Sequence, residues 1–176
     1  VPLGKAIIGK YNDGEINIKI EENVRNKHVF LVQSTSKSPG ASVNDNIMEL
    51  YLMARTLKRS SAKEVTAIIP YYGYARQDRK TTSRVPISAS DVAMLLEASG
   101  IDRVVAIDLH CGQLQGFFHK IPVDNIYASI VATEYFKDRN LQDIVVVSPD
   151  AGGVERAKKF REQLSKVGVK SDFAVV

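Results

Sequence analysis

VTAIIPYYGYARQDRKTTSR, residues 65–84, joins an apolar run to a polar, cation-rich segment. Residues 65–69 are short and rich in β-branched side chains, which is typical of a strand buried on both faces of a parallel sheet. Pro70 has no backbone N–H to donate within a sheet, so it ends the strand. The sequence therefore predicts a core strand that leads directly into a polar loop.

The loop after this predicted strand carries more positive than negative charge. Its cations are Arg76, Arg79, Lys80 and Arg84, and Asp78 is its only carboxylate. In an open α/β sheet, ligands bind beyond the carboxyl ends of the strands, and cations there suit an anionic ligand such as a polyphosphate. A solvated basic loop without a ligand is the alternative, because charge runs usually form exposed surface.

Strand-like and helix-like segments alternate along the chain. The other predicted strands are 5–8, 16–20, 28–33, 103–107, 144–147 and 173–176, and the predicted helices are 46–59, 87–99, 127–136 and 154–167. Asp45 or Asn46 is expected to cap the first helix, and residues 119–124 are expected to form a loop. This alternation predicts an α/β fold with a doubly wound, mostly parallel sheet.

Composition limits the class of protein and its partners. The 176 residues suffice for one full domain, and 44% of them are hydrophobic, as in ordinary globular proteins. No apolar run approaches the roughly 20 residues that span a bilayer, and the single cysteine, Cys111, fits a reducing, cytoplasmic location. The net charge of +4 is small and the cations are clustered, which favours a small anionic ligand. We therefore expect no membrane and no nucleic-acid partner.

A predicted hairpin turn near the start of the chain places an aromatic ring beside two carboxylates. Asp13 and Gly14 form the tight turn, in which the glycine supplies the positive φ, and Tyr11 and Glu15 flank it. One interpretation is turn geometry alone, because Asp-Gly turns are common. The other is a base-binding site, in which the ring stacks on a base and the carboxylates accept hydrogen bonds from its amino group.

Carboxylates also follow two later predicted strands. Asp108 and His110 lie two residues apart after one strand, so their side chains point the same way and are able to share a divalent cation. A hydrogen-bonded structural histidine is the alternative. Asp150 repeats the position of Asp108 after the next strand, and the two glycines that follow it open a helix whose N–H groups can approach an anion.

Seven motifs together resemble the ribose-phosphate diphosphokinase family, also called phosphoribosyl pyrophosphate synthetase. In chain order they are YNDGE, NDNIMEL, IPYYGYARQDRK, SRVPISA, DLHCGQLQGFF, PVDN and SPDAGG, and they cover nearly all of the chain. The resemblance implies transfer of the diphosphoryl group of ATP to ribose 5-phosphate with Mg²⁺, giving phosphoribosyl pyrophosphate and AMP. It also implies two similar domains of phosphoribosyltransferase-like fold and a homo-oligomer, a hexamer built from dimers.

The resemblance implies roles for individual residues. The nucleotide-binding positions of the family are matched by Tyr11, Asp13, Gly14, Glu15, Arg76 and Gln77. Tyr11 stands where the family usually has a phenylalanine that stacks on the adenine of a neighbouring subunit. The metal-binding positions are matched by His110, Asp150, Asp108 and Asp124. Cations and Mg²⁺ together would neutralise the triphosphate and hold it in line for displacement.

Two segments depart from the family pattern. His119 and Lys120 stand where the family commonly has one aspartate, so a metal-binding role at that position is not implied here. The loop 34–43 is longer than usual in a region that helps to form the family's regulatory site, so allosteric control by phosphate or ADP is not carried over.

The expected domains are 1–140, an N-terminal nucleotide-binding domain, and 141–176, the incomplete start of a second, similar domain. The catalytic lysine and the ribose-phosphate loop of the family are expected beyond Val176, so the catalytic residues stay unknown. We expect residues 1–176 alone to bind nucleotide without turnover, because positioning of both substrates supplies most of such catalysis.

Two other functions share this fold class, and fold alone does not exclude them. A non-catalytic associated subunit of the same assembly would have an altered RQD run, but Arg76, Gln77 and Asp78 are intact. A phosphoribosyltransferase that consumes the product is disfavoured, because this chain carries the nucleotide-binding and metal-binding positions.

Overall fold

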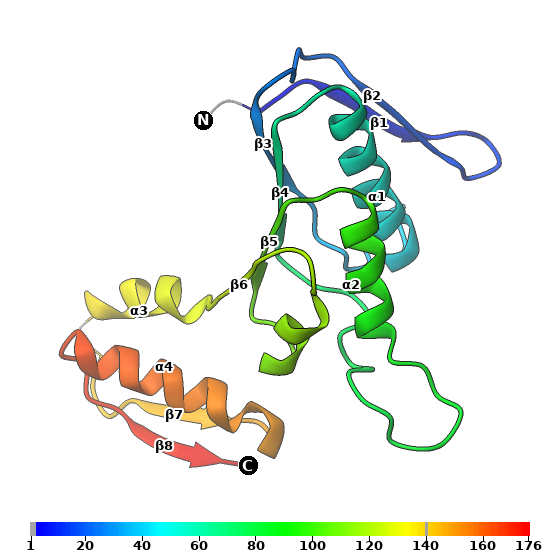
Figure 1. The fold of residues 1–176 in the computed structure, drawn as a ribbon. Helices are drawn as coiled ribbons and strands as arrows, with labels where there is room; N and C mark the ends of the chain where they lie inside the picture. Colours follow the sequence, from blue (N-terminus) through cyan, green and yellow to red (C-terminus); the bar gives the residue numbers. More distant parts are fainter. Residues whose placement is uncertain (1–2, 140) are drawn as a thin grey trace. The chain divides into compact units, whose positions relative to one another are not determined.

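The computed structural model describes residues 3–139 and 141–176, which form two compact units. The first unit is Val1–Ile126 and the second is Tyr127–Val176. Parallel strands alternate with helices in both units, which confirms the expected α/β fold (Figure 1).

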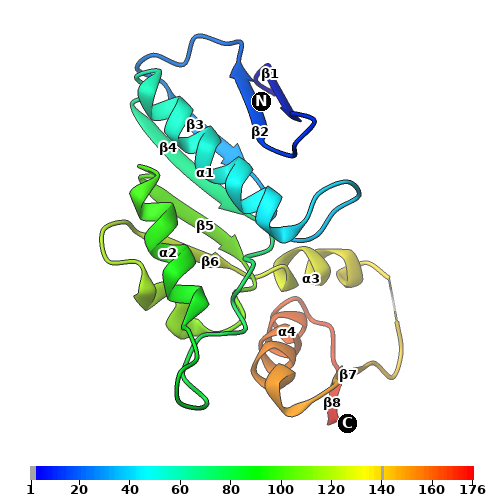
Figure 2. The same cartoon turned by 90° about the vertical axis from the view of Figure 1, so that its right-hand side faces the viewer.

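A parallel sheet of four strands forms the middle of the first unit. Its strands, in hydrogen-bonded order, are β3 (His28–Val32), β4 (Glu64–Ile69), β5 (Arg103–Ile107) and β6 (Val123–Ile126). Because strand order follows chain order, right-handed crossovers place the connecting helices on one face. The helices α1 (Val43–Arg59) and α2 (Ser88–Ala98) lie side by side on that face (Figure 2). The central strands β4 and β5 therefore end next to each other.

Strand β6 lies partly in a segment that the sequence analysis assigns to a loop. Val123 pairs with Val104 and Ile126 pairs with Ile107 of β5, so residues 119–124 are a loop only up to residue 122. The strand has four residues, too few to show a period in the sequence. Pairing with β5 determines its conformation, and the loop prediction is wrong for its last two residues.

An antiparallel hairpin precedes the sheet. It consists of β1 (Ala6–Lys10) and β2 (Ile16–Ile20), close to the ranges that the alternating isoleucines predict. Gly14 has a φ of 96° in the connecting turn, as an Asp-Gly turn requires. Ile18 and Ile20 pack against the core of the first unit.

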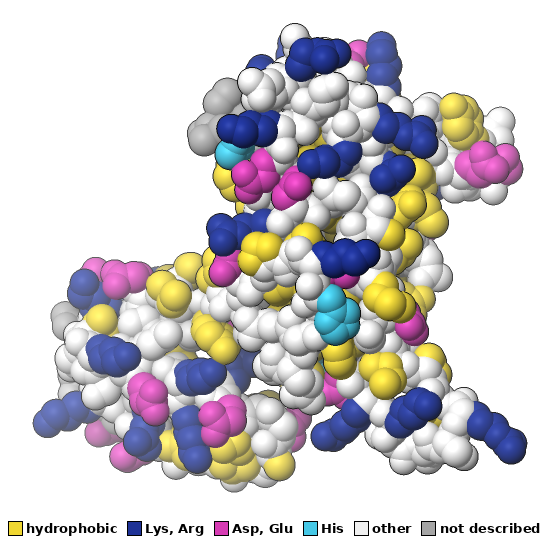
Figure 3. Space-filling view, in the orientation of Figure 1, with side chains coloured by type: hydrophobic (Ala, Val, Ile, Leu, Met, Phe, Trp, Pro, Cys, Tyr) yellow, Lys and Arg dark blue, Asp and Glu magenta, His cyan; other side chains and the backbone are white. Residues whose placement is uncertain are grey.

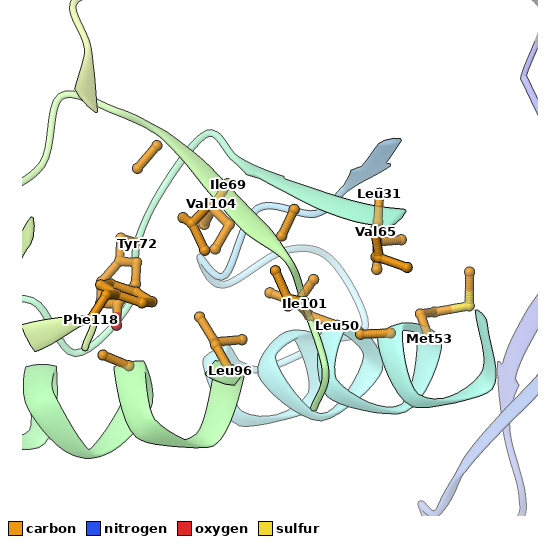
Figure 4. Packing of buried hydrophobic residues seen from close by; sticks show 14 of the residues in the cluster. Leu31, Leu50, Met53, Val65, Ile69, Tyr72, Leu96, Ile101, Val104 and Phe118 are labelled. Carbon is orange, nitrogen blue, oxygen red and sulfur yellow. The ribbon is translucent and has the colours of Figure 1, made fainter. Parts of the chain in front are cut away.

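The core of the first unit lies between the sheet and its two helices (Figure 4). Leu50 of α1, Leu96 of α2 and Val104 of β5 are each exposed by 1% or less. Burial of one such side chain contributes about 1.5–3 kcal/mol to folding. The apolar residues of α1 that are buried here, such as Leu50, Ala54 and Leu57, thus serve packing.

Helix α1 begins earlier than expected. Its N-cap is Ser42, whose Oγ accepts a hydrogen bond from the Asp45 N–H at 3.1 Å, while the Asp45 carboxylate accepts one from the Ser42 N–H at 2.7 Å. This reciprocal capping box satisfies N–H groups that a helix start leaves unpaired. The expected cap at Asp45 or Asn46 is wrong, because Asp45 occupies the third helical position of the box.

Asp45 also joins α1 to the hairpin. Its Oδ2 lies 2.9 Å from Nζ of Lys10. Hydrogen bonds from Ser42 and Lys10 lower the pKa of Asp45 from 3.8 to about 2. Because the pKa is lower in the folded state, the ionised carboxylate stabilises the fold above about pH 4, and this stabilisation is lost as the pH falls toward about 2.

We expect Lys10→Met to raise the pKa of Asp45 toward 3.8, because one donor and one positive charge are removed. A ¹³C NMR titration of the Asp45 carboxyl carbon measures this shift. Lys19→Met is the matched control on the same hairpin, since Lys19 Nζ lies 3.4 Å from Glu21 and should not affect Asp45. An unchanged midpoint in Lys10→Met would contradict the prediction.

The second unit contains a two-stranded parallel sheet and two helices. Its elements are α3 (Ser129–Lys137), β7 (Val145–Ser148), the short 3₁₀ helix η2 (Ala151–Gly153), α4 (Val154–Lys166) and β8 (Asp172–Val175). Phe136 of α3 packs against Phe160 of α4, with ring centroids 6.2 Å apart. Because α3 packs on α4, the compact units divide before it, whereas the sequence analysis places a domain boundary after residue 140.

The helices have lengths that are usual in globular domains. Helix α1 has 17 residues, α4 has 13 and α2 has 11. Within residues 3–139 and 141–176, none is both long and apolar enough to cross a bilayer.

Candidate functional site

Two backbone segments meet closely where β3 and β4 end. The Gly73 N–H donates to Thr35 Oγ1 at 2.6 Å, and this hydroxyl donates to the Tyr71 carbonyl at 2.8 Å. A Cβ atom on Gly73 would lie 2.7 Å from the Thr35 carbonyl oxygen, closer than Cβ atoms in proteins approach other heavy atoms. The start of the β4–α2 loop (residues 70–87) is therefore fixed against the chain that follows β3.

Aromatic residues anchor the β4–α2 loop to the first unit. Tyr72 is 5% exposed, its ring packs edge-on to Phe118, and its hydroxyl donates to the Ala89 carbonyl at 3.2 Å. Burial raises the pKa of Tyr72 well above its usual range. The Tyr74 hydroxyl donates to Asn44 Oδ1. These rings serve structure, which leaves ligand binding to the polar residues that follow.

Arg76 and Gln77 lie on the exposed part of the β4–α2 loop. The Gln77 carbonyl accepts a hydrogen bond from the Ala89 N–H at 3.2 Å, and its Oε1 accepts one from the Ser88 hydroxyl. Both donors lie in the first turn of α2, so Gln77 is held while its amide nitrogen is able to donate. Within the part of the chain that the structure describes, the Arg76 side chain has no hydrogen bond or ion pair.

Basic side chains gather over this loop. Figure 3 shows Lys and Arg at the lower right of the view, where Figure 1 shows the segment between β4 and α2. Arg76, Arg79, Lys80 and Arg84 are all exposed. A positive, accessible surface at the carboxyl end of a central strand is suited to a polyphosphate.

Asp78 links the β4–α2 loop to the chain after β5. Cys111 Sγ and Gln113 Nε2 each donate to Asp78 Oδ2 at 3.0 Å. The hydrogen bond from Cys111 lowers the pKa of Asp78. Burial, together with the hydrogen bond to Asp78 and the negative charge of its carboxylate, raises the pKa of Cys111 to about 11. An ionised carboxylate and a neutral thiol thus connect two loops that are distant in sequence.

Three non-glycine residues on these two loops have left-handed backbone conformations. The φ angle is 63° at Tyr74 and Arg84 and 47° at Asp108. Such conformations cost about 1–3 kcal/mol each and persist only where the surrounding structure imposes them. They turn the chain sharply at the edge of the sheet where the candidate site lies.

The segment after β5 holds two of the predicted metal ligands. His110 is exposed, and it lies close enough to Asp78 to contribute to the lowering of that pKa. Asp108 is half-buried, and its N–H donates to the Ile126 carbonyl at 2.9 Å. Asn125 of β6 holds the residue between them, because its Oδ1 accepts a hydrogen bond from the backbone N–H of Leu109 at 3.1 Å.

The other predicted ligands lie elsewhere. Asp124 is part of β6, and its Oδ2 lies 3.4 Å from Nε of Arg103, the first residue of β5. Its carboxylate is thus paired toward the amino end of β5, whereas Asp108 and His110 follow the carboxyl end.

Asp150 lies in the second unit, where it starts a turn at the end of β7. Its Oδ1 accepts a hydrogen bond from the Gly153 N–H at 2.8 Å, and its carbonyl accepts one from the Ser148 hydroxyl at 2.7 Å. A Cβ atom on Gly153 would lie 2.8 Å from Ser148 Oγ, so a larger residue there would displace this hydroxyl. Oδ2 of the carboxylate retains acceptor capacity toward a cation.

Within residues 3–139 and 141–176, no group of three or more His, Cys, Asp or Glu side chains is arranged to hold a metal ion. Mg²⁺ commonly uses only one or two carboxylates and completes its shell with waters and substrate phosphates. Asp108 and His110 in the first unit, and Asp150 in the second, each offer the kind of oxygen or imidazole donor that suits this open mode of binding better than a closed protein site.

Tyr11 is 57% exposed at the tip of the hairpin. Its N–H donates to the Glu15 carbonyl at 2.8 Å and its carbonyl accepts from the Gly14 N–H at 2.9 Å. Asp13 Oδ1 accepts from the Glu15 N–H at 3.1 Å, so one carboxylate oxygen stabilises the turn. The ring itself is accessible to a partner.

The residues that organise the edge of the sheet are not evident from the sequence. In the sequence Asp78 is one charge in a basic loop, and no local pattern predicts contacts for Cys111, Gln113 or Asn125. The partners of Asp78 lie 33 and 35 residues away, so no local pattern shows them. The available signal was that polar residues follow two adjacent strands, whose ends must meet.

Comparisons with known proteins give a family match. Residues 1–100 match the family model described as the N-terminal domain of ribose phosphate pyrophosphokinase. The chain belongs to this family. Ribose-phosphate pyrophosphokinases from Helicobacter pylori and Ralstonia nicotianae are 53% and 54% identical to it over 163 and 165 residues. Each alignment covers 93% of this chain but only 50% and 51% of the two relatives.

A solved structure of the ribose-phosphate pyrophosphokinase family shows the same fold. The crystal structure of phosphoribosylpyrophosphate synthetase from Mycobacterium smegmatis is 42% identical and superposes with a TM-score of 0.84 over 100% of this chain and 57% of that chain. This likeness supports the expected phosphoribosyltransferase-like fold. The chain spans about half the length of the curated relatives it matches.

Proposed function

We propose that the protein is a ribose-phosphate pyrophosphokinase that transfers the diphosphoryl group of ATP to ribose 5-phosphate, giving phosphoribosyl pyrophosphate and AMP. The observation that carries this proposal is the arrangement of Arg76, Gln77 and Asp78 at the end of β4. Arg76 is exposed and unpaired among the described residues, Gln77 is held by α2, and Asp78 is turned toward the chain after β5. Family membership supports the same activity.

In this proposal the protein binds and orients the triphosphate of ATP. Arg76 donates charge-assisted hydrogen bonds to phosphate oxygens, and the Gln77 amide nitrogen donates from a fixed position. Asp78 does not neutralise these donors, because Cys111 and Gln113 occupy its Oδ2. Positioning and charge compensation are what phosphoryl-type transfer chiefly requires of a protein.

Mg²⁺ is the proposed cofactor, and when bound it neutralises charge on the phosphates. The proposed ligands are Asp108, His110 and Asp150. Asp124 is a weaker candidate, because Arg103 pairs with its carboxylate. We also propose a nucleotide-binding domain over residues 1–140 with a second, similar domain after it, a hexameric assembly and a cytoplasmic location.

The hairpin tip is proposed to bind adenine in a neighbouring subunit, through the ring of Tyr11 and the turn residues Asp13, Gly14 and Glu15. We expect Tyr11→Ala to raise the KM for ATP of the full-length enzyme by about 5- to 150-fold, because base stacking on an aromatic ring is worth about 1–3 kcal/mol. Steady-state kinetics at saturating ribose 5-phosphate measure this effect. Tyr11→Phe keeps the ring and should behave as wild type, and equal KM values in all three proteins would exclude this role.

The proposed activity is tested by AMP release from ATP in the full-length protein. We expect turnover that requires both ribose 5-phosphate and Mg²⁺, and no turnover by residues 1–176 alone. Absence of ribose-phosphate-dependent AMP in the full-length protein would overturn the proposal. A non-catalytic subunit is not favoured, since the two relatives named above both carry the enzyme's name.

A further inference from the structure

We propose that Asp78 is a positioning residue: it ties the β4–α2 loop to the chain after β5 and so sets Arg76 and Gln77 in place before nucleotide binds. This inference rests on the proposed function, because it assigns Asp78 a task in that same site. Asp78 need not touch ATP to perform it.

The contacts of Asp78 distinguish it from its neighbours in the loop. Its side chain is 10% exposed, whereas that of Arg79 is 76% exposed. Two donors from another segment, Cys111 Sγ and Gln113 Nε2, reach the same oxygen at 3.0 Å. Gln113 lies in the 3₁₀ helix η1 (Gly112–Phe117), whose Leu114 is fully buried in the core. The carboxylate is therefore attached to a fixed part of the first unit.

The direction of this link also determines which charges face a ligand. A carboxylate two residues from Arg76 could pair with it and cancel its charge. Instead Oδ2 of Asp78 is occupied from the β5 side, and among the described residues its one ion pair with a Lys or Arg side chain is with Arg79, at the 4.0 Å limit of such a pair. Arg76 thus keeps its charge for an anion.

Arg76, Gln77 and Asp78 have different roles in the loop. Gln77 is held from the α2 side by Ser88 and Ala89, and Asp78 is held from the β5 side. The exposed Arg76 comes directly before these two held residues in the chain, so their positions determine where its backbone lies. Without the Asp78 anchor, the loop would have to be ordered when nucleotide binds, and that cost would weaken binding.

Steady-state kinetics of the full-length protein test this inference with the variants Asp78→Ala and Gln113→Ala and the double variant. We expect each single variant to raise the KM for ATP about tenfold, with a smaller change in kcat, and we expect the double variant to be no worse than the more affected single one. Cys111→Ser keeps a donor to Asp78 and should stay within about twofold of wild type. A wild-type KM in Asp78→Ala, or multiplicative effects in the double variant, would overturn the inference.

Hydrogen exchange of the ligand-free protein separates this inference from the proposed function. We expect Asp78→Ala to speed exchange of amides in the β4–α2 loop but not in α1, because the hydrogen bonds and ion pair of Asp78 among the described residues go to Cys111, Gln113 and Arg79. If wild type lacks ribose-phosphate-dependent turnover, the proposed function fails whatever the exchange shows. If wild type is active and Asp78→Ala exchanges and binds as wild type, the positioning role fails.

Should Asp78→Ala not fold, Asp78→Asn keeps the size of the side chain and removes its charge, and a wild-type KM in that variant overturns the charge argument.

Discussion

Arg76→Ala is expected to lower kcat/KM for ATP in the full-length enzyme by roughly 100- to 1000-fold, the loss typical when one donor to a developing or transferred charge is removed. Arg76 is exposed at the carboxyl end of a central strand, and its side chain has no hydrogen bond or ion pair among the residues that the structure describes. Its removal should therefore leave folding almost unchanged. The whole effect should appear in nucleotide binding and turnover.

Two further variants sharpen this test. Arg76→Lys keeps the positive charge but not the planar fork of donors, so an intermediate loss is expected. Arg59→Ala removes another exposed arginine from the last turn of α1, at the opposite end of the sheet, and should keep wild-type kinetics. Unchanged kcat and KM in Arg76→Ala, or an equal loss in Arg59→Ala, would contradict a polyphosphate site at the end of β4.

Gly73→Val is expected to destabilise the first unit by about 2–3 kcal/mol, in the range of severe overpacking. A Cβ atom at this position would lie 2.7 Å from the backbone carbonyl of Thr35 and 3.0 Å from Val43 Cγ1. Backbone cannot rotate away as a side chain can, so the chain after β4 must shift. The shift would also break the hydrogen bond from Gly73 to Thr35.

Urea unfolding of Gly73→Val and wild type measures this loss of stability. Gly73→Ala should show a smaller loss in the same direction, because its single Cβ meets the same carbonyl. Gly112→Ala is the matched control, since a Cβ there has no atom within 4 Å and its φ is not in the left-handed region. Equal midpoints for Gly73→Val and Gly112→Ala would show that the close approach to Thr35 has no energetic consequence.

Most of the fold is predictable because its signals are local. The alternation of Ile16, Ile18 and Ile20 predicts β2, and the apolar run before Pro70 predicts β4, one of the two central strands of the sheet. Two local predictions failed. The predicted start of α1 is wrong because Asp45 and Ser42 are both good capping residues. The reciprocal hydrogen bonds of the capping box make Ser42 the N-cap. The predicted end of the loop before β6 is wrong because the conformation of a four-residue strand depends on pairing with its neighbour, here β5.

The exposed candidates Arg76, Gln77 and Tyr11 were found from the sequence, since charge, turn type and strand ends are local features. The residues that hold the β4–α2 loop in place were not found from the sequence. The Gln77 contact to Ser88 crosses 11 residues, and the Asp78 contacts to Cys111 and Gln113 cross 33 and 35 residues. These pairs meet only because β4 and β5 are neighbours in the sheet and α2 lies over them.

The sequence by itself determined the helices, every strand except β6, the positive loop after β4 and the family likeness, because periodicity, turn chemistry and motifs need only neighbouring residues. Tertiary structure alone decided which polar groups hold the loop and which remain available to a ligand. Asp78 illustrates the reason: the same carboxylate could cancel Arg76 or bind the chain after β5, and the pairing of two strands places its partners at 3.0 Å and decides the outcome.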